Sequence, residues 1–259
     1  MQSSTGMVSE VERVAIEIYE MLRCERGDAA AVHDINPAVL HSSWELLQRL
    51  GLGEFDDDAQ RCIAIEPEVA MARLIRLCQQ VLLTREADAA EAVWGAPAGL
   101  APPRWTLDGH AGLRLVTGHQ AVAAALADAY RASASSRFTV HGDSVPEWGR
   151  STHADVEMAG RGVDIRQVYR CRSALSGRQR RHLQAVTEAG VQVRLDPCPP
   201  IDLIIIDDAS VILPDPDRPG WALALIESTV WAHATRLVAD QCWDAAVDHA
   251  AVGTASLPA

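Results

Sequence analysis

The sequence predicts an α/β protein, α+β over its whole length, in which a small helical unit precedes a longer α/β sandwich. Three observations support this prediction. Residues 1–65 read as short helices closed by a hairpin, residues 66–104 read as one long helix and a hinge, and residues 105–259 alternate between apolar strands and helices. Strands separated by helices of about 12 to 15 residues are typical of an α/β sandwich with a largely parallel or mixed sheet.

The N-terminal unit has the order of helices and strands found in a winged helix-turn-helix. The first helix follows Ser9, a candidate cap, and a helix from Pro37 follows Asn36, also a candidate cap. Between them lies a short apolar segment, 29–35, and after them come two short strands around an acidic turn at 52–67. Three helices followed by a two-stranded wing predict a winged helix.

The stretch 66–94 is helical throughout, with apolar residues Ala70, Leu74, Leu77 and Val81 at intervals of 4, 3 and 4. Such a helix either packs on its own domain or joins two copies of the chain. The Gly- and Pro-rich stretch that follows, GAPAGLAPPRW, is typical of a linker.

The second domain begins with a strand pattern and alternates to the end of the chain. We expect strands at 113–117, 137–142, 163–170 and 191–195, an Ile-rich hairpin at 199–214 and a strand at 221–227. Helices are expected at 119–134, 146–159, 176–190 and 229–250.

Composition excludes several classes of protein. The formal net charge of -12 disfavours a protein that coats nucleic acid or a membrane surface, because both need a positive field. No apolar run reaches the roughly 18 residues of a membrane span, and the N-terminus lacks the pattern of a signal peptide, so we expect a cytoplasmic protein without membrane contact.

The residue types also limit the chemistry of any site. All 23 basic residues are arginine, which excludes a Schiff-base lysine and a Walker A loop. The six cysteines show no CxxC pair, and His119, His141 and His153 have no metal-ligand spacing. We therefore expect no metal and no cofactor.

Three stretches carry a resemblance to a known family: RGVDIRQVYR, EAGVQVRLDPCPPIDLIIIDDASVILP and the closing helix with WDAA. They resemble the phospholipase D-like domain of TrmB-like and LuxR-type actinobacterial regulators, in which that domain follows a winged helix. The resemblance covers nearly the whole chain. LuxR-type relatives continue into a second, C-terminal helix-turn-helix, whereas this sequence stops at GTASLPA, so the resemblance implies a regulator that lacks it.

The same resemblance bears on catalysis. Active phospholipase D-like enzymes carry a nucleophilic histidine, a phosphate-holding lysine two residues later and an aspartate five residues after that. With Asp207 as this aspartate, the histidine position holds Pro200 and the lysine position holds Asp202. The resemblance therefore implies a degenerate motif, and we expect a pseudoenzyme and no enzyme activity.

Arginines cluster between residues 161 and 181, where seven of them accompany a single acid, Asp164. Such a surface is suited to an anionic small molecule or an acidic protein partner, and the best candidates for contact are Arg170, Arg172 and Arg178. Alternatively, these arginines are solvated or paired with carboxylates of the same chain.

DNA binding is predicted from the helix that starts at Pro37, whose candidate contact residues are His41, Ser42, Ser43, Gln48 and Arg49. Against it, residues 1–65 hold five arginines and twelve acids, and the wing is acidic.

Three hypotheses remain open at this point. In the first, the chain is a ligand- or partner-responsive transcriptional regulator that forms a homodimer through the helix 66–94 or the terminal helix around Trp231 and Trp243. In the second, it is an accessory protein that does not bind DNA and uses the winged helix to grip a peptide or protein, for example in natural-product biosynthesis. The third is an enzyme that uses residues outside the motif.

Overall fold

The computed structural model of the chain describes residues 9–24, 35–56, 61–94, 112–142, 148–170 and 176–249. The chain divides into two compact units, Met1–Leu113 and Arg114–Ala259, which we describe separately. The predicted linker at 95–105 and nearly all of the short segment expected at 29–35 lie outside the described residues.

The first unit contains three helices and one hairpin among its described residues: α1 (Glu10–Arg23), α2 (Pro37–Arg49), β1 (Gly53–Asp56), β2 (Arg61–Ala64) and α3 (Pro67–Trp94). Both predicted caps are confirmed. Ser9 accepts the backbone N–H of Glu12, whose side chain accepts the N–H of Ser9 in return, and Asn36 accepts the N–H of Ala38. β1 and β2 pair antiparallel, which confirms the predicted hairpin.

Buried apolar side chains hold the elements of the first unit together. The Tyr19 hydroxyl, on α1, donates to the carbonyl of Ile65 at 2.8 Å and so ties α1 to the residue that follows the hairpin. Gly53 is required where β1 begins, because a Cβ atom there would lie 2.9 Å from the Trp44 ring. On α3, Ala70 and Leu74 of the predicted stripe are buried.

The second unit carries most of the sheet. Its strands are β3 (Leu113–Thr117), β4 (Ser136–His141), β5 (Asp164–Arg170), β6 (Gln192–Asp196), β7 (Leu203–Ile206), β8 (Ser210–Pro214), β9 (Ala222–Glu227) and β10 (Val247–Asp248). Its helices are α4 (His119–Ala132), α5 (Trp148–Gly160), α6 (Gly177–Glu188) and α7 (Thr229–Ala245).

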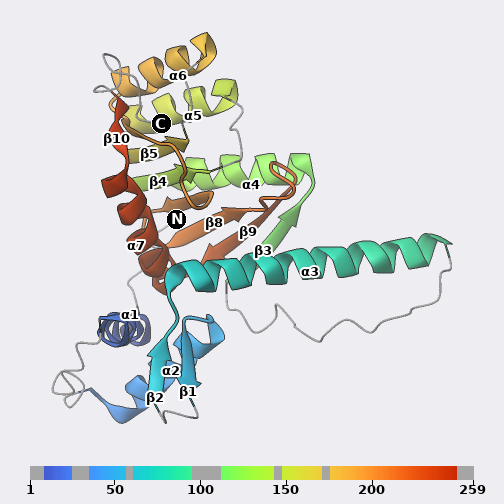
Figure 1. The fold of residues 1–259 in the computed structure, drawn as a ribbon, viewed down its shortest axis with the longest axis vertical. Coiled ribbons are helices and arrows are strands. Elements are labelled where there is room, and N and C mark those ends of the chain that lie inside the picture. The colour runs from blue at the N-terminus through green and yellow to red at the C-terminus, as the bar shows by residue number, and fades with distance from the viewer. Residues whose placement is uncertain are drawn as a thin grey trace, which may run out of the picture. The chain divides into compact units, whose positions relative to one another are not determined.

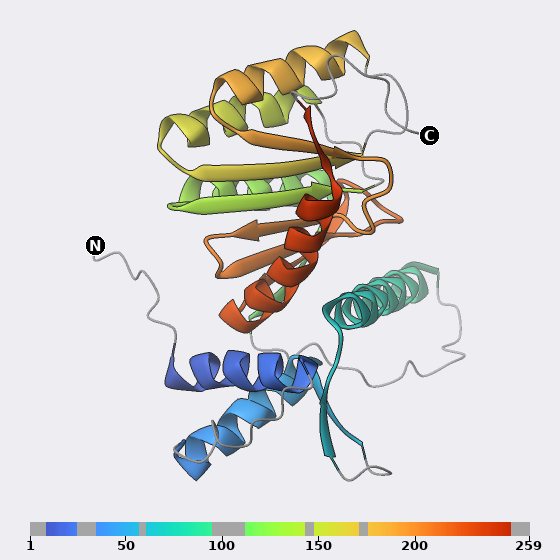
Figure 2. The same ribbon diagram turned by 60° about the vertical axis from the view of Figure 1, so that its left-hand side comes forward.

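The eight strands form one mixed sheet in the order β10-β6-β5-β4-β7-β8-β9-β3. β4, β5 and β6 are parallel, while β7 pairs antiparallel with β4 and continues into β8 and β9. Helices α4, α5 and α6 cover one face of the sheet, and α7 crosses the other face (Figures 1 and 2). The predicted α/β fold with a mixed sheet is thus confirmed.

The last helix is shorter than expected. It ends at Ala245, and Ala246 adopts an extended conformation with ψ 152°. The next two residues then pair with β6, Val247 opposite Leu195 and Asp248 opposite Arg194. The predicted helix to residue 250 is wrong because the edge of β6 offers these residues backbone hydrogen bonds that a helix end lacks.

Alternation along each strand sends side chains to two different cores. On the face covered by α4, Ile204 and Ile206 of β7 pack with Val122. On the α7 face, the Phe138 ring meets the Trp243 ring edge-on, with 5.8 Å between the ring centres. In the part of the chain that the structure describes, no helix is long and apolar enough to cross a membrane.

Candidate functional site

The exposed face of α2 is polar. His41, Glu45, Gln48 and Arg49 are exposed on it, and Ser42 is half-buried. His41 Nε2 lies 3.3 Å from the Glu45 carboxylate, so part of this face is occupied by an acid that would oppose a phosphate. Gln48 and Arg49, near the end of the helix, are therefore the groups best placed for nucleic acid.

Ser43 does not belong to this face. Its side chain is fully buried, and its hydroxyl donates to the carbonyl of Val11 on α1 at 2.9 Å. The prediction that Ser43 contacts DNA is therefore wrong. The helical spacing could have predicted that Ser43 is buried, because Ser43, Leu47 and Leu50 lie at i, i+4 and i+7 and share the buried side of the helix.

Part of the negative charge of the hairpin beside α2 is compensated by an arginine of the same unit. Glu54 of β1 forms an ion pair with Arg73 of α3, so its charge is compensated within the unit. Arg61 is exposed, and so is the Phe55 side chain, at 46%. The acids at 57 and 58 lie outside the described residues.

In the second unit, the Asp202 carboxylate has a structural role at the lysine position of the motif. It is buried and accepts the backbone N–H of Gly142 at 2.8 Å, just after the end of β4. A Cβ atom on Gly142 would lie 3.1 Å from Asp202 Oδ2, so the backbone approaches this carboxylate closely. Pro200, at the histidine position, is exposed.

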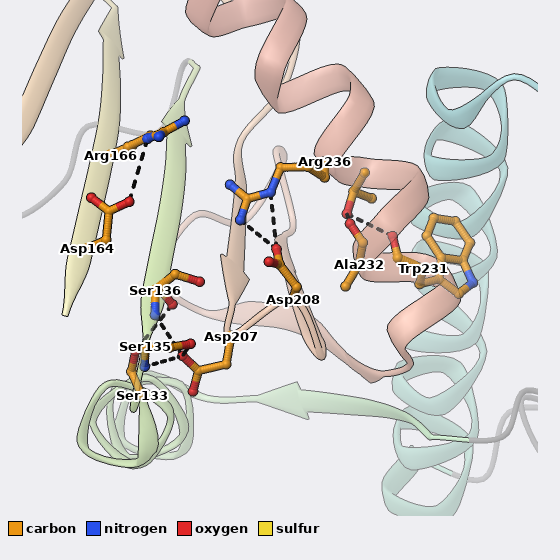
Figure 3. Close-up of polar contacts among 11 residues, drawn as sticks. Ser133, Ser135, Ser136, Asp164, Arg166, Asp207, Asp208, Trp231, Ala232 and Arg236 are labelled. Carbon is orange, nitrogen blue, oxygen red and sulfur yellow. Dashed lines mark hydrogen bonds and ion pairs between the residues drawn. The ribbon is translucent and has the colours of Figure 1, made fainter. Parts of the chain in front are cut away.

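Asp207 holds the other end of β7. Its carboxylate accepts the backbone N–H groups of Ala134, Ser135 and Ser136 at 2.8 to 2.9 Å and the Ser135 hydroxyl at 2.9 Å (Figure 3). Burial raises the pKa of Asp207, but these hydrogen bonds outweigh burial and lower it overall. Asp202 and Asp207 therefore fasten β7 to the two ends of β4.

His141 is the last residue of β4 and was not a candidate site residue in the sequence. Its ring stacks on Tyr169, with 4.5 Å between ring centres. Burial first, and then the charges of Arg137 and His182, lower the pKa of His141 to about 3, so the ring is neutral at physiological pH. Spacing could not identify it, because its neighbours come from β5 and α6.

The arginine cluster of the sequence is divided in space. Arg170 ends β5 and Arg178 is exposed in the first turn of α6, whereas Arg172 lies outside the described residues. Arg161 donates to the carbonyl of Tyr130, near the beginning of β4, and Arg166 lies in a pocket at that same end of the sheet. The cluster is therefore not one surface, and contact of Arg170, Arg172 and Arg178 with a ligand stays a prediction.

The fold is similar to several solved structures. One is Nuc, a phospholipase D family member from Salmonella typhimurium, with 16% identity and a TM-score of 0.46 over 53% of this chain and 98% of that chain. Another is NucT from Helicobacter pylori, with 12% identity and a TM-score of 0.45 over 52% and 98%. TrmBL2, an archaeal chromatin protein described with a novel mode of DNA binding, has 12% identity and a TM-score of 0.44 over 89% and 91%.

No family model matches the chain, and no curated protein sequence matches it. The prediction that the chain is not an enzyme is contradicted by the likeness to Nuc, a phospholipase D family member, and we do not retain it. That prediction rested on Pro200 and Asp202. The absence of histidine and lysine at these two positions argues only against chemistry that uses this motif. His141 and its neighbours do not belong to the motif.

Proposed function

We propose that the chain is a DNA-binding transcriptional regulator whose second unit responds to a ligand or a protein partner. The observation that supports this proposal is the exposed polar face of α2, beside a two-stranded hairpin in the same unit. In winged helix-turn-helix proteins, a helix in this position enters the major groove while its buried side packs on the preceding helices. The relation to LuxR-type regulators stays a prediction.

DNA binding is tested by a gel shift with the promoter fragment upstream of the chain's own gene, at about 50 mM salt. Retardation that is lost on raising the salt supports the proposal, and we expect a small salt slope because residues 1–65 offer few cations. No retardation of that fragment, together with recovery of a defined peptide or protein on the immobilised chain, would replace the regulator with the accessory protein.

Replacing Arg49 with alanine should weaken operator binding by about tenfold or more, because this exposed guanidinium is one of the few cations near the reading face. Fluorescence anisotropy with a labelled operator measures the change. Arg13→Ala is the matched control, since it also removes one exposed arginine from the same unit but breaks only an ion pair with Glu17 on α1. Equal losses in both variants would mean that only net charge matters.

A two-fold operator needs two copies of the reading helix, so we predict a homodimer. Light scattering should give twice the 28.0 kDa of the chain. Trp231 is 1% exposed in the single chain and is not a candidate for the interface, whereas Leu83 of α3 is 58% exposed. Leu83→Glu should therefore give a monomer, and the control Val156→Glu on α5 should not; a wild-type monomer at micromolar concentration contradicts the prediction.

A further inference from the structure

A pocket of about 290 Å³ opens in the second unit where the parallel strands β4 and β5 begin, between the sheet and α7. Six charged side chains line it: Arg137, Asp164, Arg166, Asp208, Arg236 and Asp240. The motif positions Pro200 and Asp202 lie at the opposite end of the strands, beyond the carboxyl end of β4, so this pocket is separate from them. Figure 3 shows four of these side chains, Asp164 with Arg166 and Asp208 with Arg236.

Two arginines of the pocket pair with acids of their own chain. Arg137 forms a buried ion pair with Asp155. Arg236 directs Nε and Nη2 to one carboxylate oxygen of Asp208, at 3.1 and 2.5 Å. Its guanidinium also lies over the Phe138 ring, 5.2 Å from the ring centre. Arg236 and Asp208 therefore line one side of the pocket as an ion pair with no net charge.

The third arginine, Arg166, makes only a long ion pair with Asp164 and no hydrogen bond with the described residues. The nearest carboxylate oxygen, on Asp164, is 3.8 Å from Arg166 Nε, which is beyond hydrogen-bonding distance. That Nε is buried and has no hydrogen-bond partner among the described residues. The guanidinium is positioned over the Trp243 ring, 5.8 Å from its centre. Buried donors without a partner are rare in proteins and indicate a missing acceptor.

The pocket also contains a carboxylate without a hydrogen-bond partner among the described residues. Asp240 of α7 is half-buried, and its carboxylate makes no hydrogen bond or ion pair with any residue that the structure describes. Burial raises the pKa of Asp240, while the charges of Arg236 and Arg166 lower it and those of Asp244 and Asp208 raise it. The charges of both arginines thus act on Asp240 across the pocket.

The charges decide which ligand the pocket fits. A simple anion would satisfy Arg166 but would meet three carboxylates, and a simple cation would leave the guanidinium without an acceptor. Among the described residues, no group of three or more acidic, His or Cys side chains could hold a metal ion. The volume is at the lower end of small-molecule sites, roughly 300 to 1,000 Å³.

We propose that this pocket binds a free α-amino acid, with its carboxylate on the Arg166 guanidinium and its ammonium group on Asp240. A zwitterion of this kind supplies both missing partners and adds no net charge to a site whose three cations and three anions already balance. Binding at this site does not depend on DNA recognition by the first unit.

The test is isothermal titration calorimetry of the full chain with each of the twenty standard L-amino acids. We expect at least one to bind, and its N-acetyl form and its methyl ester to bind about tenfold more weakly or worse, because each lacks one of the two charges. The absence of binding by all twenty, or equal binding of the amino acid and its methyl ester, overturns the proposal.

Two variants locate the site. Arg166→Gln and Asp240→Asn should each weaken binding by about tenfold or more, since each replaces a charged partner with a neutral polar one. Arg131→Gln is the control, because Arg131 pairs with Asp128 on the exposed side of α4. Thermal unfolding without ligand checks that the variants fold. Undiminished binding by both folded pocket variants would place the ligand elsewhere and overturn the assignment.

Discussion

An Asp155→Ala variant should lose about 3 to 5 kcal/mol of the free energy of unfolding of the second unit, because it leaves a buried arginine without its counter-ion. Asp155 of α5 and Arg137 of β4 form an ion pair whose side chains are 1% and 2% exposed. Burial lowers the pKa of Arg137, but the charge and hydrogen bond of Asp155, together with Tyr130 and Tyr169, outweigh burial and raise that pKa. Because a guanidinium keeps its proton in proteins, Arg137 cannot escape the penalty in the variant by becoming neutral.

The pair is already incompletely satisfied in the native protein. Arg137 Nε and Asp155 Oδ2 have no hydrogen-bond partner among the described residues. Replacing both partners with apolar side chains, as Arg137→Met with Asp155→Leu, should consequently restore stability to within about 1 to 2 kcal/mol of wild type. Urea unfolding of the three proteins measures this difference.

A surface pair provides the comparison. Asp128→Ala removes the partner of Arg131 on α4, where both side chains are about 70% exposed (71% and 70%), and should cost about 0.5 kcal/mol or less. If Asp155→Ala were as mild as Asp128→Ala, the ion pair would not be desolvated in solution. If the double variant were no more stable than Asp155→Ala, the pair itself would be required for the fold.

Asp207→Ala should cost about 2 to 4 kcal/mol, because three backbone N–H groups lose a charged acceptor. A second cause adds to the first: Asp207 has φ 52°, a left-handed conformation that Asp and Asn adopt more readily than Ala. Asp207→Asn should cost less, since Asn keeps one acceptor oxygen and tolerates that backbone. Chemical denaturation compares the three proteins.

The Asp207 contribution should also depend on pH. The hydrogen bonds lower its pKa in the folded chain below that of the unfolded chain, about 3.9. The stabilisation is therefore fully present well above that value and is lost as the pH falls through the lower pKa of the folded state. The stability difference between wild type and Asp207→Asn should shrink below about pH 4. A difference that stays constant from pH 7 to pH 3 would contradict this role.

Much of the fold follows from local patterns in the sequence. Ser9 predicts the start of α1, Asn36 with Pro37 predicts the start of α2, and the helix expected from residue 176 has Ser176 as its cap, all as observed. These capping patterns extend over only three or four residues, so they can be recognised in the sequence without the tertiary structure. The end of α7 could not be predicted in this way, because it depends on pairing of the next residues with strand β6, some fifty residues earlier in the chain.

What the sequence by itself determined is most of the helices and strands, the small N-terminal unit with its hairpin, and the α/β character of the rest. Only the tertiary structure decided what the polar residues do. Asp207 meets Ala134 across 73 positions of the chain, and Arg166 and Asp240 meet one pocket from a strand and a distant helix. The physical reason is that local periodicity records which face of an element is buried, whereas strand order and register decide which distant side chain lies opposite.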